Sequence, residues 1–445
     1  MKKLIQNLIL VIILSMIILF SYAFLQNKID SFDFHEIYDF LMNKSAGEKQ
    51  SGETDLSSSD KEYRAVWLSY LEFNAYRKSV DKNDEESFRK FYKRVLDRSK
   101  ACGINRVIVQ VRPFSDALYP SEYFPWAACI SGTQGKSPGY DPLKIMVEMT
   151  HNRQMYIEAW INPYRISTGN SIKDLSTDNP AKKWAASTKN ARNVLSYEEA
   201  LYYNPSSSSV RKLICDGIEE IISKYDVDGI HMDDYFYPVF TEKNVESVFD
   251  APEYKKQKEY SSSSDSIAEW RRNNVNMLVS DIYNTIKQKN KSVSFGISPA
   301  GNLSNLRSNL EYYVDIDTWV KDEGYVDYVM PQIYWGYTNT QAPFDKTLKE
   351  WEQLTKGTGV KLYVGLQLYR MGTTDQTQLD YAELQKANLI TKQIKEIEKS
   401  KTAEGYCIFS YQYLDVDNKT YQFDTNEFSA KRKRVLKKIG KDLSK

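Results

Sequence analysis

Two adjacent carboxylates follow a short apolar segment in the middle of the chain. Residues 229–232 read Gly-Ile-His-Met and predict a buried strand, after which come Asp233, Asp234 and the aromatic run Tyr235-Phe-Tyr-Pro238. Side chains alternate along a strand, so His231 and Asp233 are expected on one face, with Asp234 beginning the turn. Carboxylates beside an apolar strand must be paired, hydrogen-bonded or shifted in pKa. The segment predicts either a reactive site that binds sugars or an aspartate pair that caps a helix and holds loops together.

Polar and aromatic side chains also stand at the ends of other apolar segments. Glu158, Trp160 and Asn162 alternate along one predicted strand and are therefore expected on a shared face. Their agreement with the aspartate segment indicates one polar, aromatic cleft. The candidates to contact a substrate at these strand ends are Trp160, Asn162, Arg112, Asp116, Tyr164, Arg165, His231, Tyr235, Ser298, Gln332, Tyr334, Trp335 and Gln367.

The elements that would position these residues alternate between short apolar strands and amphipathic helices from Glu62 onward, which is typical of parallel α/β folds. Strands are expected near 64–69, 106–111, 155–161, 229–233, 293–298, 325–334, 362–368 and 406–410. Helices between them are expected over 86–101, 142–152, 208–224, 267–289, 344–357 and 382–399. Eight strands favour a closed (β/α)8 TIM barrel with loop insertions, whose active site lies at the carboxyl ends of the strands. An open doubly wound sheet is the rival, but no GxGxxG or Walker sequence follows the first strand.

Cleavage of a glycosidic bond requires one carboxylic acid and one carboxylate, on either side of the sugar. Asp233, Asp234 and Glu158 are the candidates for these catalytic roles, and Asp116 is a weaker one. The alternative for Glu158 is a buried carboxylate paired with Arg112 or Arg165. These arginines are equally suited to hold a substrate carboxylate or to orient Asp233.

His231 is expected to orient Asp233 rather than to transfer a proton, since a lone histidine inside a barrel strand is usually a hydrogen-bonded core residue. The candidates to stack on sugar rings are Trp160, Tyr235, Tyr237, Tyr334, Trp335 and Tyr337, although each ring alone would fit a role in packing.

Charge and composition exclude several other classes. Lys plus Arg number 60 against 59 Asp plus Glu, so no general field attracts nucleic acid. Four cysteines without CxxC spacing and only three histidines argue against a zinc site. No GxSxG elbow supports a serine nucleophile. The expected chemistry requires neither a cofactor nor a metal ion.

The first segment bears on the compartment. Lys2 and Lys3 precede an uncharged apolar run over residues 8–25, about long enough to cross a bilayer as a helix. No convincing small-residue cleavage site follows, so residues 1–26 are expected to be a transmembrane signal anchor, with secretion after cleavage as the alternative. Residues 27–61 are polar and predict a flexible extracytoplasmic tether. Residues 62–445 would form the barrel and a C-terminal helix.

Ordered motifs give the sequence a family resemblance. These are Arg64–Trp67, Gln110–Pro113, Gly132–Leu143, Glu158–Arg165, Asn204-Pro205, Asp228–Pro238, Gly296–Pro299 and Met330–Trp335. Together they resemble glycosyl-hydrolase-like family 10, a group of bacterial exported (β/α)8 barrels formerly catalogued as a domain of unknown function. The resemblance spans about residues 62–413 and implies a glycosidase-like barrel. One branch of the family acts on peptidoglycan glycan strands stripped of their stem peptides.

The resemblance also carries over to individual residues. It places Asp233 and Asp234 on the family's paired aspartates and Glu158 on its strand-three glutamate. The chain lacks the lipobox of lipoprotein members and carries long polar loops near 167–203 and 239–266.

The sequence therefore predicts a membrane-tethered, extracytoplasmic glycoside hydrolase acting on peptidoglycan or another amino-sugar glycan. The glycan is its expected partner, and the N-terminal helix is its expected contact with the membrane. The alternatives are a non-catalytic glycan-binding barrel in cell-wall or spore-coat assembly, and a hydrolase of a secreted exopolysaccharide.

Overall fold

The computed structural model describes residues 63–260, 265–421 and 428–444. Residues 62–445 form one compact unit. The predicted signal anchor and tether, residues 1–61, lie outside the described residues. Within the described ranges, no helix combines the length and the hydropathy that a membrane span needs.

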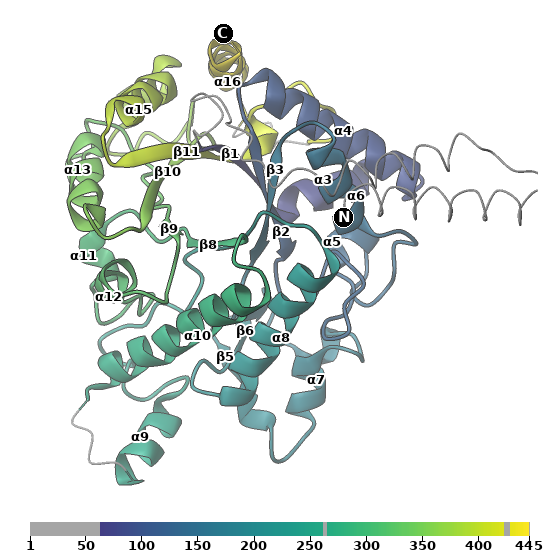
Figure 1. Ribbon diagram of the computed structural model, residues 1–445, viewed down its shortest axis with the longest axis vertical. Coiled ribbons are helices and arrows are strands. Elements are labelled where there is room, and N and C mark those ends of the chain that lie inside the picture. The colour runs from purple at the N-terminus through teal and green to yellow at the C-terminus, as the bar shows by residue number, and fades with distance from the viewer. Residues whose placement is uncertain (1–62, 261–264, 422–427, 445) are drawn as a thin grey trace, which may run out of the picture. The chain divides into compact units, whose positions relative to one another are not determined.

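Eight parallel strands close into a barrel at the centre of this unit (Figure 1). The strands are β1 (Tyr63–Leu68), β2 (Arg106–Arg112), β3 (Tyr156–Ile161), β7 (Gly229–Met232), β8 (Ser294–Ile297), β9 (Tyr328–Val329), β10 (Lys361–Gln367) and β11 (Ala403–Phe409). They are hydrogen-bonded in the order β1-β11-β10-β9-β8-β7-β3-β2, with β2 returning to β1. The predicted (β/α)8 barrel is confirmed. The main difference is β9, which is only two residues long where ten were expected, because Pro331 follows it closely and cannot donate to a ladder.

Helices surround the barrel and bury their apolar sides against it (Figure 1). The longer ones are α3 (Tyr70–Ser79), α4 (Glu85–Ala101), α6 (Pro142–His151), α8 (Ser208–Lys224), α10 (Ile267–Lys289), α13 (Phe344–Thr355), α15 (Asn388–Lys399) and α16 (Ala430–Leu443). Helices α8 and α10 have the predicted bounds, and Ser207 caps α8 by accepting from the Val210 amide. The helix predicted over 382–399 is divided into α14 (Tyr381–Leu384) and α15.

Short helices complete the connections between the strands. They are α5 (Ala128–Ser131), α7 (Pro180–Ala185), α11 (Leu303–Leu306), α12 (Ile316–Lys321) and the 3-10 turns η2 (Ile172–Asp174), η3 (Ala191–Asn193) and η4 (Tyr411–Tyr413).

The two long polar loops have structure of their own. Between β3 and α8, strands β4 (Arg165–Ser167), β5 (Val194–Tyr197) and β6 (Ala200–Tyr203) form an antiparallel sheet in the order β4-β6-β5. The second insertion carries α9 (Ala251–Tyr260), and a fully buried ion pair of 2.8 Å between Asp250 and Arg271 fastens it to α10. Both insertions leave from the carboxyl ends of barrel strands, which is the face expected to carry function.

Alternating side chains give the barrel two separate apolar regions. Val107, Val109 and Val111 point outward into the large core between strands and helices. A smaller aromatic cluster, including Trp67, Trp160 and Tyr328, fills the barrel interior. Its packing depends on Gly296, since a Cβ there would lie 2.1 Å from the Tyr328 ring. The barrel is therefore a packed core and not a channel.

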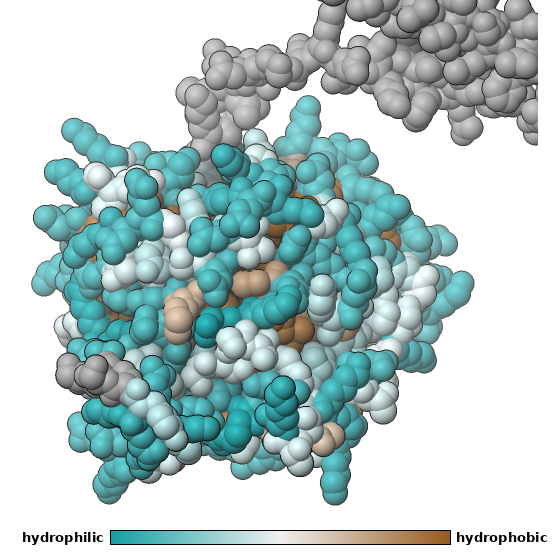
Figure 2. All heavy atoms as spheres, turned by 60° about the horizontal axis from the view of Figure 1, so that its bottom comes forward, coloured by the Kyte–Doolittle hydropathy of each residue, from teal (hydrophilic) through white to brown (hydrophobic). Residues whose placement is uncertain are grey.

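Figure 2 shows one face of the molecule, on which hydrophilic residues cover most of the coloured surface. Hydrophobic residues appear there as small groups in recesses between hydrophilic ones. This face therefore offers no broad apolar area for docking.

Candidate active site

A pocket of about 330 Å³ opens at the carboxyl ends of the barrel strands. The residues that line this pocket lie at the carboxyl ends of barrel strands or just beyond them. The lining residues are Trp67, Trp160, Asp233, Asp234, Tyr235, Ser298, Gln332, Tyr334, Tyr369 and Phe409. Six aromatic side chains surround two carboxyl groups, which is the composition of a site for a flat, hydroxylated ligand.

Asp233 is held in place by a relay of amides. Asn162 Nδ2 donates to both of its carboxylate oxygens, at 3.4 and 3.2 Å, and the Tyr235 backbone amide donates at 3.1 Å. Asn162 in turn accepts from Gln110 Nε2 at 2.8 Å, and Gln110 Oε1 accepts from the Tyr70 amide at 3.0 Å. The relay begins on α3 and crosses β2 and β3, so the rigid barrel fixes the carboxyl group. Asn162 was expected to contact the substrate, but it does not line the pocket and instead positions Asp233.

The two carboxyl groups share one buried environment. Burial raises the pKa of Asp233 to about 8, and the charge of Asp234 adds to this shift, whereas Tyr235, Asn162 and Trp160 oppose it. Burial also raises the pKa of Asp234 to about 6, against hydrogen bonding from its own backbone amide and Gln332. Because the pair titrates together, it keeps one proton between the two groups near neutral pH. Such a pair offers a proton donor and an anion side by side.

His231 lies beneath the pocket and has partners other than Asp233. Trp67 Nε1 donates to its Nε2 at 3.2 Å, so the ring proton is on Nδ1, which donates to the Tyr328 hydroxyl at 2.8 Å. Burial lowers the pKa of His231 to about 3, so the ring is neutral. The expectation that His231 orients Asp233 is therefore wrong. The histidine joins Trp67 in the pocket wall to the interior of the barrel.

Glu158 belongs to the opposite end of the barrel. Its side chain is fully buried, accepts from Tyr63 and from Arg106 at 2.9 Å each, and accepts from the Tyr328 hydroxyl. Glu158 pairs in register with Gly229, and Asp233 lies four residues further along, which is about 13 Å at about 3.3 Å per residue. Glu158 does not line the pocket, so the expectation that it is a catalytic carboxylate is wrong. The alternative role as a paired carboxylate fits, although the partner is Arg106 and not Arg112 or Arg165.

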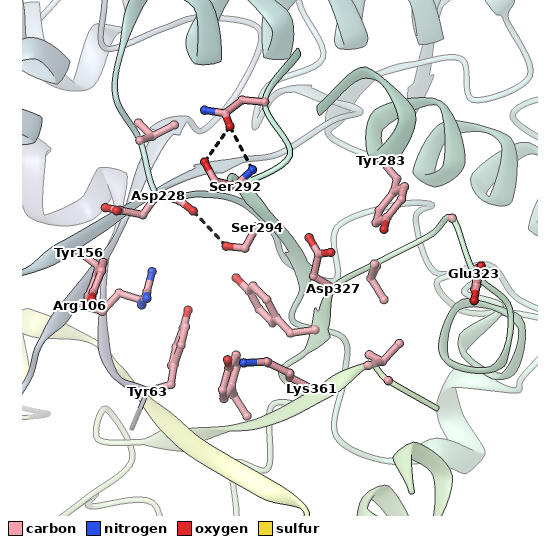
Figure 3. Close-up of a pocket in the computed structure, with 18 of the residues that line it drawn as sticks. Tyr63, Arg106, Tyr156, Asp228, Tyr283, Ser292, Ser294, Glu323, Asp327 and Lys361 are labelled. Atoms are coloured by element: carbon pink, nitrogen blue, oxygen red, sulfur yellow. Dashed lines mark hydrogen bonds between the residues drawn. The ribbon is translucent and has the colours of Figure 1, made fainter. Parts of the chain in front are cut away.

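A second hollow, of about 720 Å³, lies at this opposite end (Figure 3). Tyr63, Arg106, Tyr156, Ser294 and Lys361 line it, and each is the first residue of its barrel strand. Several of its ionic groups are engaged within the protein, among them Arg106 with Glu158 and Lys361 with Glu404. The Arg106 guanidinium lies over the rings of Tyr63 and Tyr156, 4.6 and 4.4 Å from their centroids. The amino ends of strands serve stability in this fold.

The structure brings several predicted substrate-binding residues together in the pocket at the carboxyl ends of the strands. Trp160, Tyr235, Ser298, Gln332 and Tyr334 line it, as expected. One of these, Ser298, offers a buried hydroxyl without a protein partner. Gln332 Nε2 donates to the Ser298 carbonyl at 2.9 Å, which joins the ends of β8 and β9. At the rim, the Arg165 guanidinium lies 5.1 Å from the centroid of the Tyr235 ring.

Other predicted residues do not line the pocket. A register shift at the end of β2 turns Arg112 toward α8, where its guanidinium stacks 3.9 Å from the centroid of Phe124. Tyr164 is fully buried in the outer core, and Trp335 packs against that core. Asp116 is buried beside Gln134, whose Nε2 donates to it at 3.1 Å, and burial raises the pKa of Asp116 to about 6. Gln367 ends β10 with a buried side-chain amide that has no protein partner.

Three pocket residues were not among the predicted ones. Trp67 stands near the end of β1, Tyr369 follows β10, and Phe409 is the last residue of β11. The same signal that identified the others, an aromatic ring at the carboxyl end of a barrel strand, marks all three. Trp67 and Phe409 belong to the first and last strands, and Tyr369 lies two residues beyond the end of β10.

The closed barrel and its carboxyl-lined aromatic pocket define the class of glycoside-hydrolase-like (β/α)8 proteins. The chain belongs to the family described as Glycosyl hydrolase-like 10, which matches residues 62–383. This confirms the resemblance drawn from the motifs.

Named relatives and a solved structure agree with this class. The chain is 37% identical over 367 residues to the glycosyl hydrolase YngK of Bacillus subtilis, covering 77% of this chain and 68% of that protein. It is 32% identical over 335 residues to the glycosyl hydrolase DigH of Escherichia coli, covering 72% and 75%. The PgaB (BpsB) glycoside hydrolase domain of Bordetella bronchiseptica superposes with a TM-score of 0.52 at 13% identity, covering 78% and 94%. That last likeness is one of fold.

Proposed function

We propose that this protein is a glycoside hydrolase that cleaves O-glycosidic bonds in a cell-wall amino-sugar glycan, with Asp233 and Asp234 as its reacting carboxyl groups. The observation that carries the proposal is the buried pair itself, which keeps a proton donor beside an anion in an aromatic pocket at the carboxyl face of the barrel. Membership of a glycosyl-hydrolase-like family supports the reaction class.

Peptidoglycan strands stripped of their stem peptides are the first substrate proposed, and other amino-sugar glycans come next. The apolar run over residues 8–25 supports an extracytoplasmic position, anchored in the cell membrane, where such a glycan is accessible. Aromatic walls formed by Trp67, Trp160, Tyr334 and Phe409 suit the apolar faces of sugar rings.

The test is release of new reducing ends from peptide-stripped peptidoglycan strands by the full chain. Asp233→Asn and Asp234→Asn are each expected to lower the rate by at least about 10²-fold, the contribution of a positioned acid or base. Asp226→Asn is the matched control, because this aspartate lies at the opposite end of the barrel with a side chain 90% exposed. Circular dichroism verifies that each variant is folded. A panel that includes a secreted exopolysaccharide tests the alternative substrate.

A non-catalytic glycan-binding barrel is the second candidate function. It is favoured by one observation, that both carboxyl groups of the pocket come from the end of a single strand. Binding of the same glycans without release of reducing ends, unaffected by Asp234→Asn, would support this candidate and overturn the first.

A further inference from the structure

We infer that the nucleophile in this pocket is supplied by the substrate, as the 2-acetamido group of a β-linked N-acetylated amino sugar. The inference rests on the proposed function and specifies its substrate class. It follows from where carboxyl groups are present and where they are missing around the pocket.

A hydrolase that uses two of its own carboxylates must place them on opposite sides of the sugar. Among the described residues that line the pocket, Asp233 and Asp234 are the only carboxylates. They are adjacent in the chain and follow one strand, β7. Consecutive Cα atoms lie about 3.8 Å apart, so both carboxyl groups arise from the same part of the pocket wall.

Buried carboxylates elsewhere do not supply the opposing group. Glu158 is about 13 Å deeper along the barrel and is engaged by Arg106. Glu72 is fully buried, caps α3 and accepts from the Ser410 hydroxyl at 2.7 Å. Asp116 is enclosed beside Gln134. None of these three lines the pocket in the described part of the chain.

The acetamido group can act where the protein offers no opposing group. In the first step its carbonyl oxygen forms a bond to C1 while the bond from C1 to the leaving oxygen breaks. One carboxyl of the pair gives its proton to the leaving oxygen, and the ionised partner accepts the acetamido N–H. A five-membered oxazoline results, and no external reactant is required.

Water completes the reaction. It attacks C1 and opens the five-membered ring, giving its proton to the carboxylate that acted as the acid. The second carboxyl returns its proton to the acetamido nitrogen, so both residues regain their starting states. Two displacements at C1 retain its configuration. The first displacement requires the leaving oxygen and the acetamido group on opposite faces of the sugar, which selects the β-linkage.

The pocket has features that suit an acetamido group. Trp67, Trp160 and Phe409 offer an apolar wall for the methyl. The Ser298 hydroxyl is a buried polar group that has no protein partner and is free to bind the substrate. Asn162 Nδ2 donates to the Asp233 carboxyl group and keeps this group oriented in the pocket.

The test compares two glycans that differ only in this group. β-1,4-linked N-acetylglucosamine oligomers are offered to the full chain alongside oligomers of the same length that have been de-N-acetylated, and a third sample that has been chemically re-acetylated. We expect kcat to fall at least about 10²-fold on de-N-acetylation and to recover on re-acetylation. The bicyclic thiazoline of N-acetylglucosamine, which resembles the oxazoline, is expected to inhibit competitively. Proton NMR is expected to show the β-anomer as the first product.

The outcomes distinguish the inference from the proposed glycoside hydrolase function on which it rests. Equal cleavage of both oligomers, or inversion at C1, overturns the substrate-supplied nucleophile and leaves the glycoside hydrolase in place. A loss confined to KM also overturns it, because the acetamido group then only binds. If no N-acetylated glycan is cleaved, including stripped peptidoglycan strands, both the inference and the proposed function fail.

Discussion

Replacing Glu158 with glutamine separates a structural glutamate from a catalytic one. In the structure two donors, Tyr63 and Arg106, meet one of its carboxylate oxygens, and Tyr328 donates to the other. A glutamine presents a single acceptor oxygen, so its amide nitrogen must face at least one of these donors. The substitution also removes the charge that compensates Arg106, whose side chain is 16% exposed.

The expected cost falls on stability. Breaking a buried pair by removing one partner costs about 3–5 kcal/mol. The Arg106 guanidinium keeps its position over the rings of Tyr63 and Tyr156, so we expect a loss near the lower limit, about 3 kcal/mol.

The expected effect on catalysis is small. At an effective dielectric constant of about 20, two charges about 13 Å apart interact by about 1.3 kcal/mol, or about one pKa unit. Removing the negative charge of Glu158 therefore lowers the pKa of Asp233 by at most about one unit. The pH optimum should move toward acid by no more than that, and kcat at the optimum should change less than about threefold.

Chemical denaturation measures the first effect, and reducing-end release across pH measures the second. Asp234→Asn is the reference for a true catalytic loss. A Glu158→Gln variant with wild-type stability and a kcat reduced more than about 10²-fold would refute the assignment, because that is the signature of a reacting carboxyl.

Three further predictions concern the aspartate pair. The rate should follow a bell-shaped pH profile with its maximum between about 6 and about 8, since the pair needs one proton and both pKa values are raised; a profile flat across this range contradicts the pair's role. Asn162→Ala removes a donor that lowers the pKa of Asp233, so the alkaline limb should move to higher pH while kcat falls about 10- to 100-fold; a fall in kcat without that movement would indicate a merely structural role. Asp233→Asn should gain stability relative to the wild type as pH rises from about 4 to about 8. The reason is that the raised pKa of Asp233 in the folded state makes its ionisation unfavourable to folding in this window. A difference in thermal midpoint between the variant and the wild type that is the same at pH 5 and pH 8 would contradict this.

The alternation of strands and helices could be read from the sequence because it depends on local periodicity. The apolar stripe of 208–224 and the short apolar runs at 106–111 and 229–232 specify their elements whatever the rest of the chain does. The rule that function lies at the carboxyl ends of barrel strands then led to Asp233, Asp234, Gln332 and Tyr334, all of which line one pocket.

Depth along the barrel was decided only by the tertiary structure. Alternation correctly placed Glu158, Trp160 and Asn162 on one face, yet Glu158 lies at the amino end and Asn162 at the carboxyl end. Periodicity tells which side of a strand a residue faces, whereas the register between strands tells how far along the axis it lies. The same applies to Arg112, which a local register shift turned outward toward α8. Register arises from contacts between segments distant in sequence, such as that of Glu158 with Gly229, so no local pattern encodes it.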